Sequence, residues 1–299
     1  MKKVKTIFMG TPEFAIPALK TLLKLSDVVC VVTKPDALVG RKKVLTPSPI
    51  KKLAIKENIP VLTPVKLKEE YQSILDYEPE LIVTCAYGKI VPKVILDYPK
   101  YGCINIHASI LPKYRGSAPM QWAIANGEKE TGITLMYMDE KMDTGDIIDI
   151  EKISILDDDD LGSIHDKMSL LGSSILEKNF SNIINNNISR VKQDDTKATL
   201  APMITREMEL LNFNDYGKNI INKIRAFSPY PLTRTMINNE EVKIVKAKFI
   251  RKENTNIGKL IITKNDLGIE CLDGIIYLEI IKPVGKKEMP IKSFLNGLK

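Results

Sequence analysis

The chain has 299 residues, of which 44% are hydrophobic and 27% charged, and its formal net charge is +7. This length allows two hydrophobic cores, and the composition is ordinary for a globular protein. No stretch approaches the roughly 20 apolar residues of a membrane helix, and the apolar run behind the basic N-terminus is short, so we expect no membrane segment and no signal peptide.

The cysteines and histidines do not indicate a metal site or disulfides. Only two histidines are present, and the cysteines form no Cys-x-x-Cys pair, so no familiar zinc-ligand spacing can be assembled. Three cysteines lie in apolar, strand-like runs, which favours small buried side chains in a reducing compartment. We therefore expect a cytoplasmic protein that needs no metal and keeps four free cysteines, namely Cys30, Cys85, Cys103 and Cys271.

The positive charge is concentrated in the last third of the chain. Residues 206–299 carry 17 Lys and Arg against 11 Asp and Glu, whereas residues 1–205 carry 27 against 26. A basic region beside a near-neutral one favours a polyanionic partner. A lysine-rich solvated surface explains the charge equally well, so charge alone does not decide between the two.

The first half of the chain alternates between buried strands and helices. Gly10 permits a tight turn after the first strand, and Ser48 followed by Pro49 is a typical helix start. This alternation predicts an α/β fold, with a Rossmann-like, mostly parallel sheet and helices on both faces. In chain order we expect a strand at Val4–Met9, a helix at Glu13–Lys24, a strand at Val28–Thr33, a helix from Pro49 to about Glu57, strands at Leu81–Ala86 and Cys103–Ala108, a helix near Ala118–Ala125 and a strand at Ile133–Met138.

The next part of the chain leads to a change of domain. A strand-like stretch at 147–156 is followed by the aspartates at 157–160, which suit the positive N-terminal end of a helix that continues to about Ile184. The polar stretch at 190–209 interrupts the periodicity and predicts a linker. We therefore expect a first domain over residues 1–189.

The last part of the chain, residues 210–299, consists of short strand-like runs. Two turn signals, Asn238-Asn239 and Asp273-Gly274, predict hairpins. This pattern predicts a small all-β, OB-like barrel. The strands are expected at Glu241–Phe249, Gly258–Ile262, Ile269–Leu272 and Ile275–Ile280.

The glycine after the first strand does not form a dinucleotide site. A pyrophosphate-binding turn needs the pattern Gly-x-Gly-x-x-Gly, and here Gly10 stands alone. Glu13 would also repel a phosphate at the start of the following helix. NAD is therefore not expected.

Two polar side chains end the strand predicted at 103–108. Residues two apart on a strand point the same way, so Asn105 and His107 share a face. An amide can donate to an oxyanion, and an imidazole can carry a proton, as acyl transfer to an amine requires. Asp143 could orient the imidazole, although spacing alone does not place it there. On these residues alone, a strand end with two polar side chains facing water is the better explanation.

The surrounding motifs resemble the folate-dependent formyltransferase family. The resemblance covers nearly the whole chain and includes the branch of the family that formylates methionyl-tRNA. It rests on Phe8–Ala15, Lys34–Asp36, Gly40–Lys43, Thr46–Pro49, Asn105–Gly116, Glu130–Thr134, Met138–Asp146, Gln193-Asp194, Lys197–Pro202, Ile224–Pro231 and Lys282–Lys287.

The resemblance implies residue roles and substrates. It implies that Asn105, His107 and Asp143 are catalytic, that 10-formyltetrahydrofolate is the formyl donor, and that the methionine of initiator methionyl-tRNA is the acceptor. We expect a monomer. The family's folate contacts match Tyr87, Gly88, Ser109, Ile110, Leu111 and Pro112.

The resemblance also implies tRNA contacts. The basic loop between Pro35 and Thr46 matches a loop that reaches the acceptor stem in this branch. A guanidinium can bind phosphate or a base edge with two hydrogen bonds, which makes arginine the favoured residue in this loop. The expected tRNA contacts are Arg41, Lys42, Lys43 and Arg225.

Some positions depart from the family pattern. Ile110 replaces a more common leucine, a swap of similar volume that should be tolerated. Leu200 and Met203 stand where the family often has tyrosine and lysine, and residues 231–234 are atypical. These departures weaken the expectation of linker contacts to tRNA and leave the catalytic residues unaffected.

Two other functions fit parts of the sequence. A formyltransferase for an amino sugar nucleotide or a ribonucleotide amine would use the same catalytic residues, although the Arg41 loop and the basic second domain argue against it. A tRNA-binding protein with an inactive formyltransferase domain is the other alternative. The intact set Asn105, His107 and Asp143 argues against that one.

Overall fold

The computed structural model describes residues 3–40 and 42–297, which form two compact units. The linker predicted at 190–209 includes the point where the first unit ends, at Ala201, and the second resumes, at Pro202. The first unit comprises Met1–Ser117, Thr131–Ile153 and His165–Ala201. The second comprises Ala118–Glu130, Ser154–Ile164 and Pro202–Lys299.

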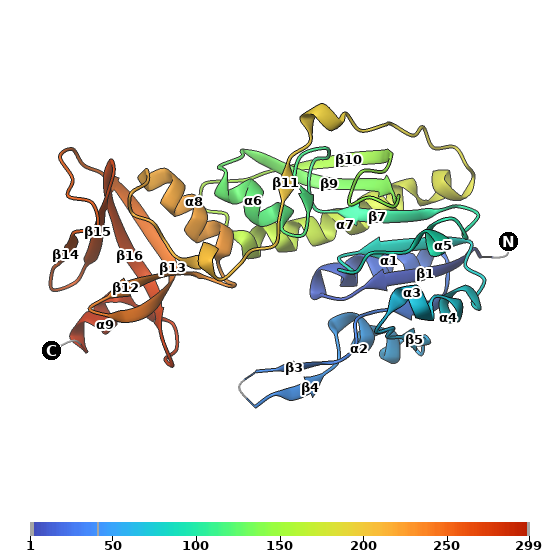
Figure 1. The fold of residues 1–299 in the computed structure, drawn as a ribbon, viewed down its shortest axis with the longest axis horizontal. Helices are drawn as coiled ribbons and strands as arrows, with labels where there is room; N and C mark the ends of the chain where they lie inside the picture. Colours follow the sequence, from blue (N-terminus) through green and yellow to red (C-terminus); the bar gives the residue numbers. More distant parts are fainter. Residues whose placement is uncertain (1–2, 41, 298–299) are drawn as a thin grey trace. The chain divides into compact units, whose positions relative to one another are not determined.

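A mostly parallel sheet forms the centre of the first unit, which confirms the predicted Rossmann-like fold (Figure 1). Its strands are β1 (Lys5–Gly10), β2 (Asp27–Val32), β5 (Val61–Leu62), β6 (Leu81–Cys85), β7 (Cys103–His107), β9 (Glu130–Tyr137) and β10 (Ile147–Ser154). Their order is β10-β9-β7-β6-β1-β2-β5, and β9 is antiparallel to β7. The chain runs from β1 outward to β5 and then returns to β6 on the other side of β1. Such a reversal opens a crevice at the carboxyl ends of the central strands.

Helices cover both faces of this sheet. Ile7 and Met9 of β1 pack with Leu67 and Ile95 on one face, where α3 (Leu67–Glu70), α4 (Gln72–Leu75) and α5 (Lys93–Leu96) lie. On the other face, the backbone of Gly172 in α7 lies against Ile106. The helices α1 (Ile16–Leu25) and α7 (Leu161–Ile184) are joined there by a hydrogen bond between the hydroxyls of Thr21 and Ser173, 2.8 Å apart.

Helix starts follow the predicted capping chemistry. The hydroxyl of Ser48 accepts a hydrogen bond from the Lys51 amide at the start of α2 (Pro49–Lys56). Asp160, the last of the four aspartates, accepts from the Ser163 amide, while the Ser163 hydroxyl accepts from the Asp160 amide. Reciprocal bonds of this kind satisfy two amides that a helix cannot pair internally.

Several short elements of the first unit were not predicted. The most prominent is an antiparallel hairpin of β3 (Ala37–Val39) and β4 (Val44–Thr46), which follows β2. Others are the 3-10 helix η2 (Asp195–Lys197) and the small parallel pair β8 (Arg115–Gly116) and β11 (Leu200–Ala201), whereas the 3-10 helix η1 (Glu13–Ala15) lies at the start of the helix predicted at Glu13–Lys24. Their two- or three-residue lengths are too short for a hydrophobic period to appear.

The second unit contains a curled antiparallel sheet of strand order β12-β13-β16-β15-β14, with β17 paired to β16 (Figure 1). The strands are β12 (Thr233–Ile237), β13 (Glu240–Arg251), β14 (Leu260–Ile262), β15 (Leu267–Cys271), β16 (Gly274–Pro283) and β17 (Met289–Pro290). Both predicted hairpins are present. Asn238 and Asn239 form the first turn with φ values of 49° and 64°, which suit asparagine.

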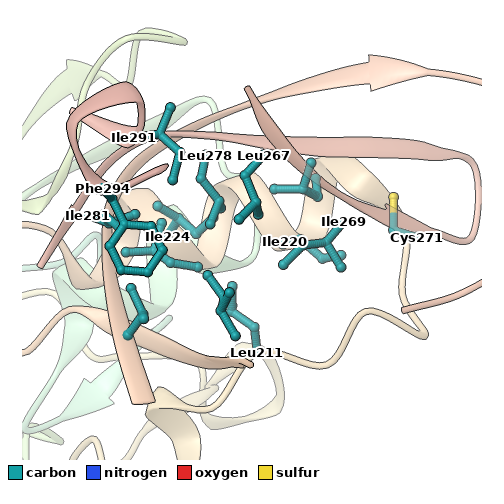
Figure 2. Close-up of a cluster of buried hydrophobic side chains, with 14 of the residues drawn as sticks. Leu211, Ile220, Ile224, Leu267, Ile269, Cys271, Leu278, Ile281, Ile291 and Phe294 are labelled. Atoms are coloured by element: carbon teal, nitrogen blue, oxygen red, sulfur yellow. The ribbon is translucent and has the colours of Figure 1, made fainter. Parts of the chain in front are cut away.

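The curled sheet confirms the predicted OB-like domain, but the expectation that residues 210–299 are all-β was wrong, because they also hold α8 (Gly217–Phe227) and α9 (Ile291–Asn296). The unit further includes η3 (Glu207–Glu209) and α6 (Pro119–Ala125), the helix that was predicted near Ala118–Ala125. Figure 2 shows that Ile220 and Ile224 of α8 face Leu267 and Leu278 of the sheet. The helix is rich in Asn and Lys on its other side, so its apolar stripe is narrow. The hydrophobic core forms where this stripe packs against the curled sheet.

No helix among the described residues has the length and apolar character to cross a membrane.

The four cysteines are buried and free, as predicted. Burial raises the pKa of Cys30, Cys85 and Cys103 to about 12 and also raises the pKa of Cys271. At pH 8 only about one in 10⁴ of the Cys30, Cys85 and Cys103 thiols would then be the reactive thiolate. We expect Ellman's reagent to label the folded protein very slowly and to label all four thiols in guanidinium. Rapid labelling of any thiol in the folded protein would contradict this burial.

Candidate active site

Strand β7 brings Asn105 and His107 to the carboxyl edge of the sheet. They share the face that Cys103 occupies, while Ile104 and Ile106 point to the opposite face. β7 lies between β6, which is parallel, and β9, which is antiparallel. The two polar side chains therefore emerge where the sheet changes from parallel to antiparallel pairing.

Asn105 is oriented by the neighbouring strand. Thr84 of β6 is its partner in the sheet register, and the Thr84 hydroxyl donates to Asn105 Oδ1 at 2.7 Å. This bond occupies the carbonyl end of the amide. Within the described residues, the structure records no partner for Nδ2. The nitrogen end is therefore available to donate to an oxygen of a bound molecule.

His107 is buried, with 6% of its surface exposed, and one tautomer fits its contacts. Its Nε2 lies 3.0 Å from the backbone oxygen of Tyr114. A carbonyl oxygen only accepts, so Nε2 carries the proton when the ring is neutral. Nδ1 lies 3.5 Å from Oδ1 of Asp143. Both ring nitrogens thus face oxygen atoms that can accept a hydrogen bond.

Asp143 lies on the loop between β9 and β10 and is brought to His107 by the fold. Its φ is +56°, and its Oδ2 accepts from the Gly116 amide at 2.8 Å. Nearby, a Cβ on Gly145 would lie 2.0 Å from the Tyr137 oxygen, so only glycine fits there. The loop conformation fixes one carboxylate oxygen on the backbone and directs the other toward the imidazole.

The sequence of this chain is similar to those of known formyltransferases. A family model described as formyl transferase matches residues 2–179, and one described as formyl transferase, C-terminal domain, matches residues 203–299. The chain is 44% identical to a methionyl-tRNA formyltransferase of Bacillus subtilis, with 98% of this chain and 94% of the relative covered. It is 45% identical to a methionyl-tRNA formyltransferase of Staphylococcus epidermidis, with 98% and 96% covered. The chain belongs to the methionyl-tRNA formyltransferase family.

A solved structure of a sugar formyltransferase has the same fold. WlaRD, a sugar 3N-formyl transferase crystallised in the presence of dTDP and 5-N-formyl-THF, is 25% identical to this chain. The two align with a TM-score of 0.69 over 96% of this chain and 100% of that one. The fold of the methionyl-tRNA formyltransferase family is therefore shared with an enzyme whose acceptor is a sugar.

The loop that the resemblance assigned to folate, residues 109–112, follows β7 directly. The buried Ser109 hydroxyl donates to the Lys113 oxygen at 2.7 Å. Thr134 holds the loop from β9, donating to the Ser109 oxygen at 2.6 Å and accepting from the Leu111 amide at 3.1 Å. Leu111 is buried, whereas Ile110 and Pro112 are partly exposed. Ser109 and Leu111 thus shape the loop from within, and the other two side chains are accessible to a ligand.

Tyr87 and Gly88 lie beyond the end of β6. The Tyr87 side chain packs among the apolar residues under the sheet, where burial raises its pKa to about 12 and leaves its hydroxyl without a partner in the described chain. Its backbone oxygen accepts from the Thr11 hydroxyl at 3.2 Å. Gly88 has a φ of +73°, and a Cβ there would lie 2.6 Å from Lys34 Nζ. Any contact of this segment with folate would therefore involve its backbone and the Lys34 ammonium.

The residues predicted to contact tRNA fall in different environments. Lys42 and Lys43 are exposed at the end of the β3–β4 hairpin, and Arg41 lies outside the described residues. The hairpin also exposes four apolar side chains that sequence reasoning had not singled out. Between 54% and 64% of their surface is accessible, and they are Leu38, Val39, Val44 and Leu45.

Arg225 has an internal role in the structure. Its NH1 donates to the backbone oxygens of Leu156, Asp157 and Asp159 at 2.8, 2.8 and 3.0 Å. NH2 donates to Asn222 Oδ1 at 3.1 Å. A guanidinium so occupied ties α8 to the 156–159 loop and has little capacity left for a phosphate, so its geometry favours a structural role.

Sequence reasoning missed the residues that hold the candidate catalytic residues in place. Thr84 stood in a strand predicted to be apolar and buried, and Tyr114 acts through its backbone. No group of three or more His, Cys, Asp or Glu side chains suited to a metal ion occurs among the described residues. The only signal for Thr84 would have been its place beside Asn105 in a parallel register, which requires the strand order.

The contact with Tyr114 predicts the tautomer of His107. Neutral His107 should be protonated at Nε2, because only that nitrogen faces a backbone carbonyl. ¹⁵N NMR distinguishes the tautomers, and with two histidines in the chain, His165→Gln assigns the signals. A neutral ring protonated at Nδ1 would show that the Tyr114 contact does not exist in solution.

Proposed function

We propose that this chain transfers the formyl group of 10-formyltetrahydrofolate to the α-amino group of methionyl-initiator tRNA, with Asn105, His107 and Asp143 as catalytic residues. One observation carries the proposal: a free amide donor and a histidine–carboxylate pair meet at the end of β7. The chain in which they meet is 44% identical to a methionyl-tRNA formyltransferase along 98% of its length.

Asn105 supplies the oxyanion donor. When an amine attacks a formyl carbon, the carbonyl oxygen gains negative charge, and a fixed N–H directed at that oxygen stabilises the transition state. Thr84 already holds Asn105 Oδ1, so Nδ2 meets this oxygen without reorganisation. An uncommitted amide donor fits a formyl carbonyl, and this fit supports a formylated folate as co-substrate.

The His107–Asp143 pair handles the proton. The attacking amine must lose one proton, and the nitrogen that gives up the formyl group must gain one. With Nε2 held by Tyr114, proton exchange falls to Nδ1, where Asp143 stabilises the charged ring. No covalent bond to the protein is needed.

The 109–112 loop and the Gly88 turn supply the folate wall in this proposal. Ile110 and Pro112 offer accessible apolar surface next to the catalytic strand. Lys34 Nζ lies beside Gly88 and can attract an anionic group of the ligand. The presence of 5-N-formyl-THF with the sugar formyltransferase of the same fold supports a folate here.

The β3–β4 hairpin is the proposed tRNA-contacting element of the first unit. Arg41, Lys42 and Lys43 carry its charge, and the exposed apolar side chains beside them can pack against unpaired bases. In the second unit, Lys246 and Lys248 are exposed on β13 and suit phosphate contacts. We leave Arg225 out of this set because the carbonyl oxygens of the 156–159 loop already occupy it.

We further infer a monomer that works in the cytoplasm. The bacterial relatives are named for a tRNA substrate, which supports that compartment. Light scattering on a sizing column should give the mass of one chain, and a dimer would overturn the inference.

Replacement of Asn105 tests the catalytic proposal. Asn105→Ala should lower turnover by about 10²–10³-fold, because one oxyanion donor is lost. Thermal unfolding should change little, since the side chain is only partly buried at a strand end. Formyl-methionyl-tRNA is measured with purified protein, 10-formyltetrahydrofolate and methionyl-initiator tRNA, with His107→Ala alongside. An Asn105→Ala enzyme with wild-type turnover would remove Asn105 from the mechanism.

The same assay separates the alternatives. A wild type that binds folate but formylates an amino sugar nucleotide or a ribonucleotide amine instead of the tRNA would replace the proposed acceptor. A protein that binds tRNA and no folate would be the inactive-domain alternative.

The hairpin proposal predicts a salt effect. Lys42→Ala with Lys43→Ala should raise KM for tRNA and leave kcat at saturating tRNA near the wild-type value. The log–log dependence of tRNA affinity on salt should become less steep by about 0.9 for each lost phosphate contact, as for a duplex. Lys100→Ala is the control, an exposed lysine that precedes β7 at the opposite edge of the sheet. Equal salt slopes for the double variant and the wild type would contradict the contact.

A further inference from the structure

The segment that follows α7 returns to the candidate active site. Val191 and Ile147 exchange backbone hydrogen bonds of 3.0 and 2.8 Å, and farther on β11 pairs with β8. Residues 193–199, between these two contacts, are called the strap here. All of them belong to the first compact unit.

The first contact of the strap is with the loop that carries Asp143. Gln193 Nε2 donates to the backbone oxygen of Asp143 at 2.9 Å and to that of Gly145 at 2.8 Å. An amide nitrogen has two hydrogens, so both are used. They hold the two carbonyl groups on either side of Thr144, in the turn where Asp143 has its positive φ.

Arg115 fixes the other end of Gln193. Its Nε and NH2 donate to Gln193 Oε1 at 3.0 and 2.8 Å, and NH2 also reaches Asp195 Oδ1 at 2.7 Å. Arginine only donates and carbonyl oxygens only accept, so the Gln193 amide has one possible orientation. Arg115 is 8% exposed, which places the Gln193 contact in a partly dehydrated environment.

The second contact of the strap is with the partner of His107. Thr199 Oγ1 accepts from the Tyr114 amide at 2.9 Å, and the Thr199 backbone oxygen accepts from the Arg115 amide at 2.9 Å. The Tyr114 backbone oxygen is the acceptor for His107 Nε2. One short segment therefore holds the carboxylate loop at one end and the imidazole's acceptor at the other.

We propose that the strap positions the His107–Asp143 pair, with Gln193 as the positioning residue for Asp143 and Thr199 for the acceptor of His107. The inference rests on the proposed function of this pair. Both ends of the Gln193 amide are occupied by protein groups, so its role is one of position. It acts by fixing where Asp143 Oδ1 lies relative to His107 Nδ1, a separation of 3.5 Å.

The decisive variant is Gln193→Glu. It keeps the size of the side chain and an oxygen for Arg115, but sets a second carboxylate oxygen against the carbonyls of Asp143 and Gly145. We expect kcat for formyl-methionyl-tRNA synthesis to fall about 10–100-fold, because a displacement of about 1 Å can cost 10²-fold. Both KM values should stay near wild type, and the kcat–pH profile should shift along the pH axis.

Asp195→Asn is the matched control. Asp195, the other partner of Arg115, has a side chain that is 79% exposed. The substitution removes its charge and leaves Gln193 in place. The kcat and pH profile of this variant should match wild type, because the asparagine keeps an oxygen that accepts from Arg115 and the carboxylate it replaces is largely solvated. A purely structural lesion would lower the melting temperature without moving the pH profile.

Thr199 provides a second test if Gln193→Glu does not fold. Thr199→Val removes the acceptor for the Tyr114 amide and should lower kcat, whereas Thr199→Ser should restore it. Wild-type kcat and pH profile in a folded Gln193→Glu protein, or wild-type kcat in Thr199→Val, would overturn the proposal.

The ring signals of His107 separate this proposal from the proposed function. The ¹⁵N shifts of His107 should change in Gln193→Glu and stay unchanged in Asp195→Asn. This measurement needs no substrate. If the wild type makes no formyl-methionyl-tRNA but these shifts behave as expected, the proposed reaction fails and the positioning role stands. Unchanged shifts in a folded Gln193→Glu protein would sink the positioning role.

Discussion

The hydrogen bond between His107 Nε2 and the Tyr114 oxygen fixes the chemistry of the site. It leaves Nδ1 as the ring nitrogen that faces Asp143, and the proposed mechanism therefore uses the histidine pair as proton carrier and Asn105 as oxyanion donor. The neighbouring contacts hold these groups in place: Thr84 binds the Asn105 amide, Gly116 binds one Asp143 oxygen, and the 109–113 loop folds back to supply Tyr114. The sheet provides the frame, because β6, β7 and β9 meet at this edge.

Much of the first unit could be predicted from the sequence because its strands are continuous apolar runs. The predicted β6 and β7 differ from the observed strands by one residue at one end, and the predicted β1 and β2 differ by one residue at each end. The second unit was less predictable. The strands with clear turn signals at Asn238 and Asp273 were found, whereas α8 was not, since its apolar face is defined by the curled sheet that covers it.

The candidate site could be predicted only in part. Strand alternation places Asn105 and His107 on one face. Asp143 lies 36 positions beyond His107 in the chain, so spacing could not place it in the site, and only the family resemblance assigned it there. The strap shows the same limit more strongly. Gln193 lies 50 residues beyond Asp143, and no periodicity connects a polar segment after a long helix with a turn that precedes it. Arg225 shows the opposite limit, since a basic residue that the family resemblance assigned to tRNA donates its hydrogen bonds to carbonyl oxygens of its own chain.

The β3–β4 hairpin has a consequence for the free protein. Two short strands with Leu38, Val39, Val44 and Leu45 exposed offer unpaired edges and apolar surface to any other extended chain. The cations at its turn oppose such association by mutual repulsion, in the manner of gatekeeper residues beside an aggregation-prone strand. The same lysines that we propose to contact RNA therefore also keep copies of the protein apart when no RNA is bound. Removing them should both weaken RNA binding and lower the solubility of the protein.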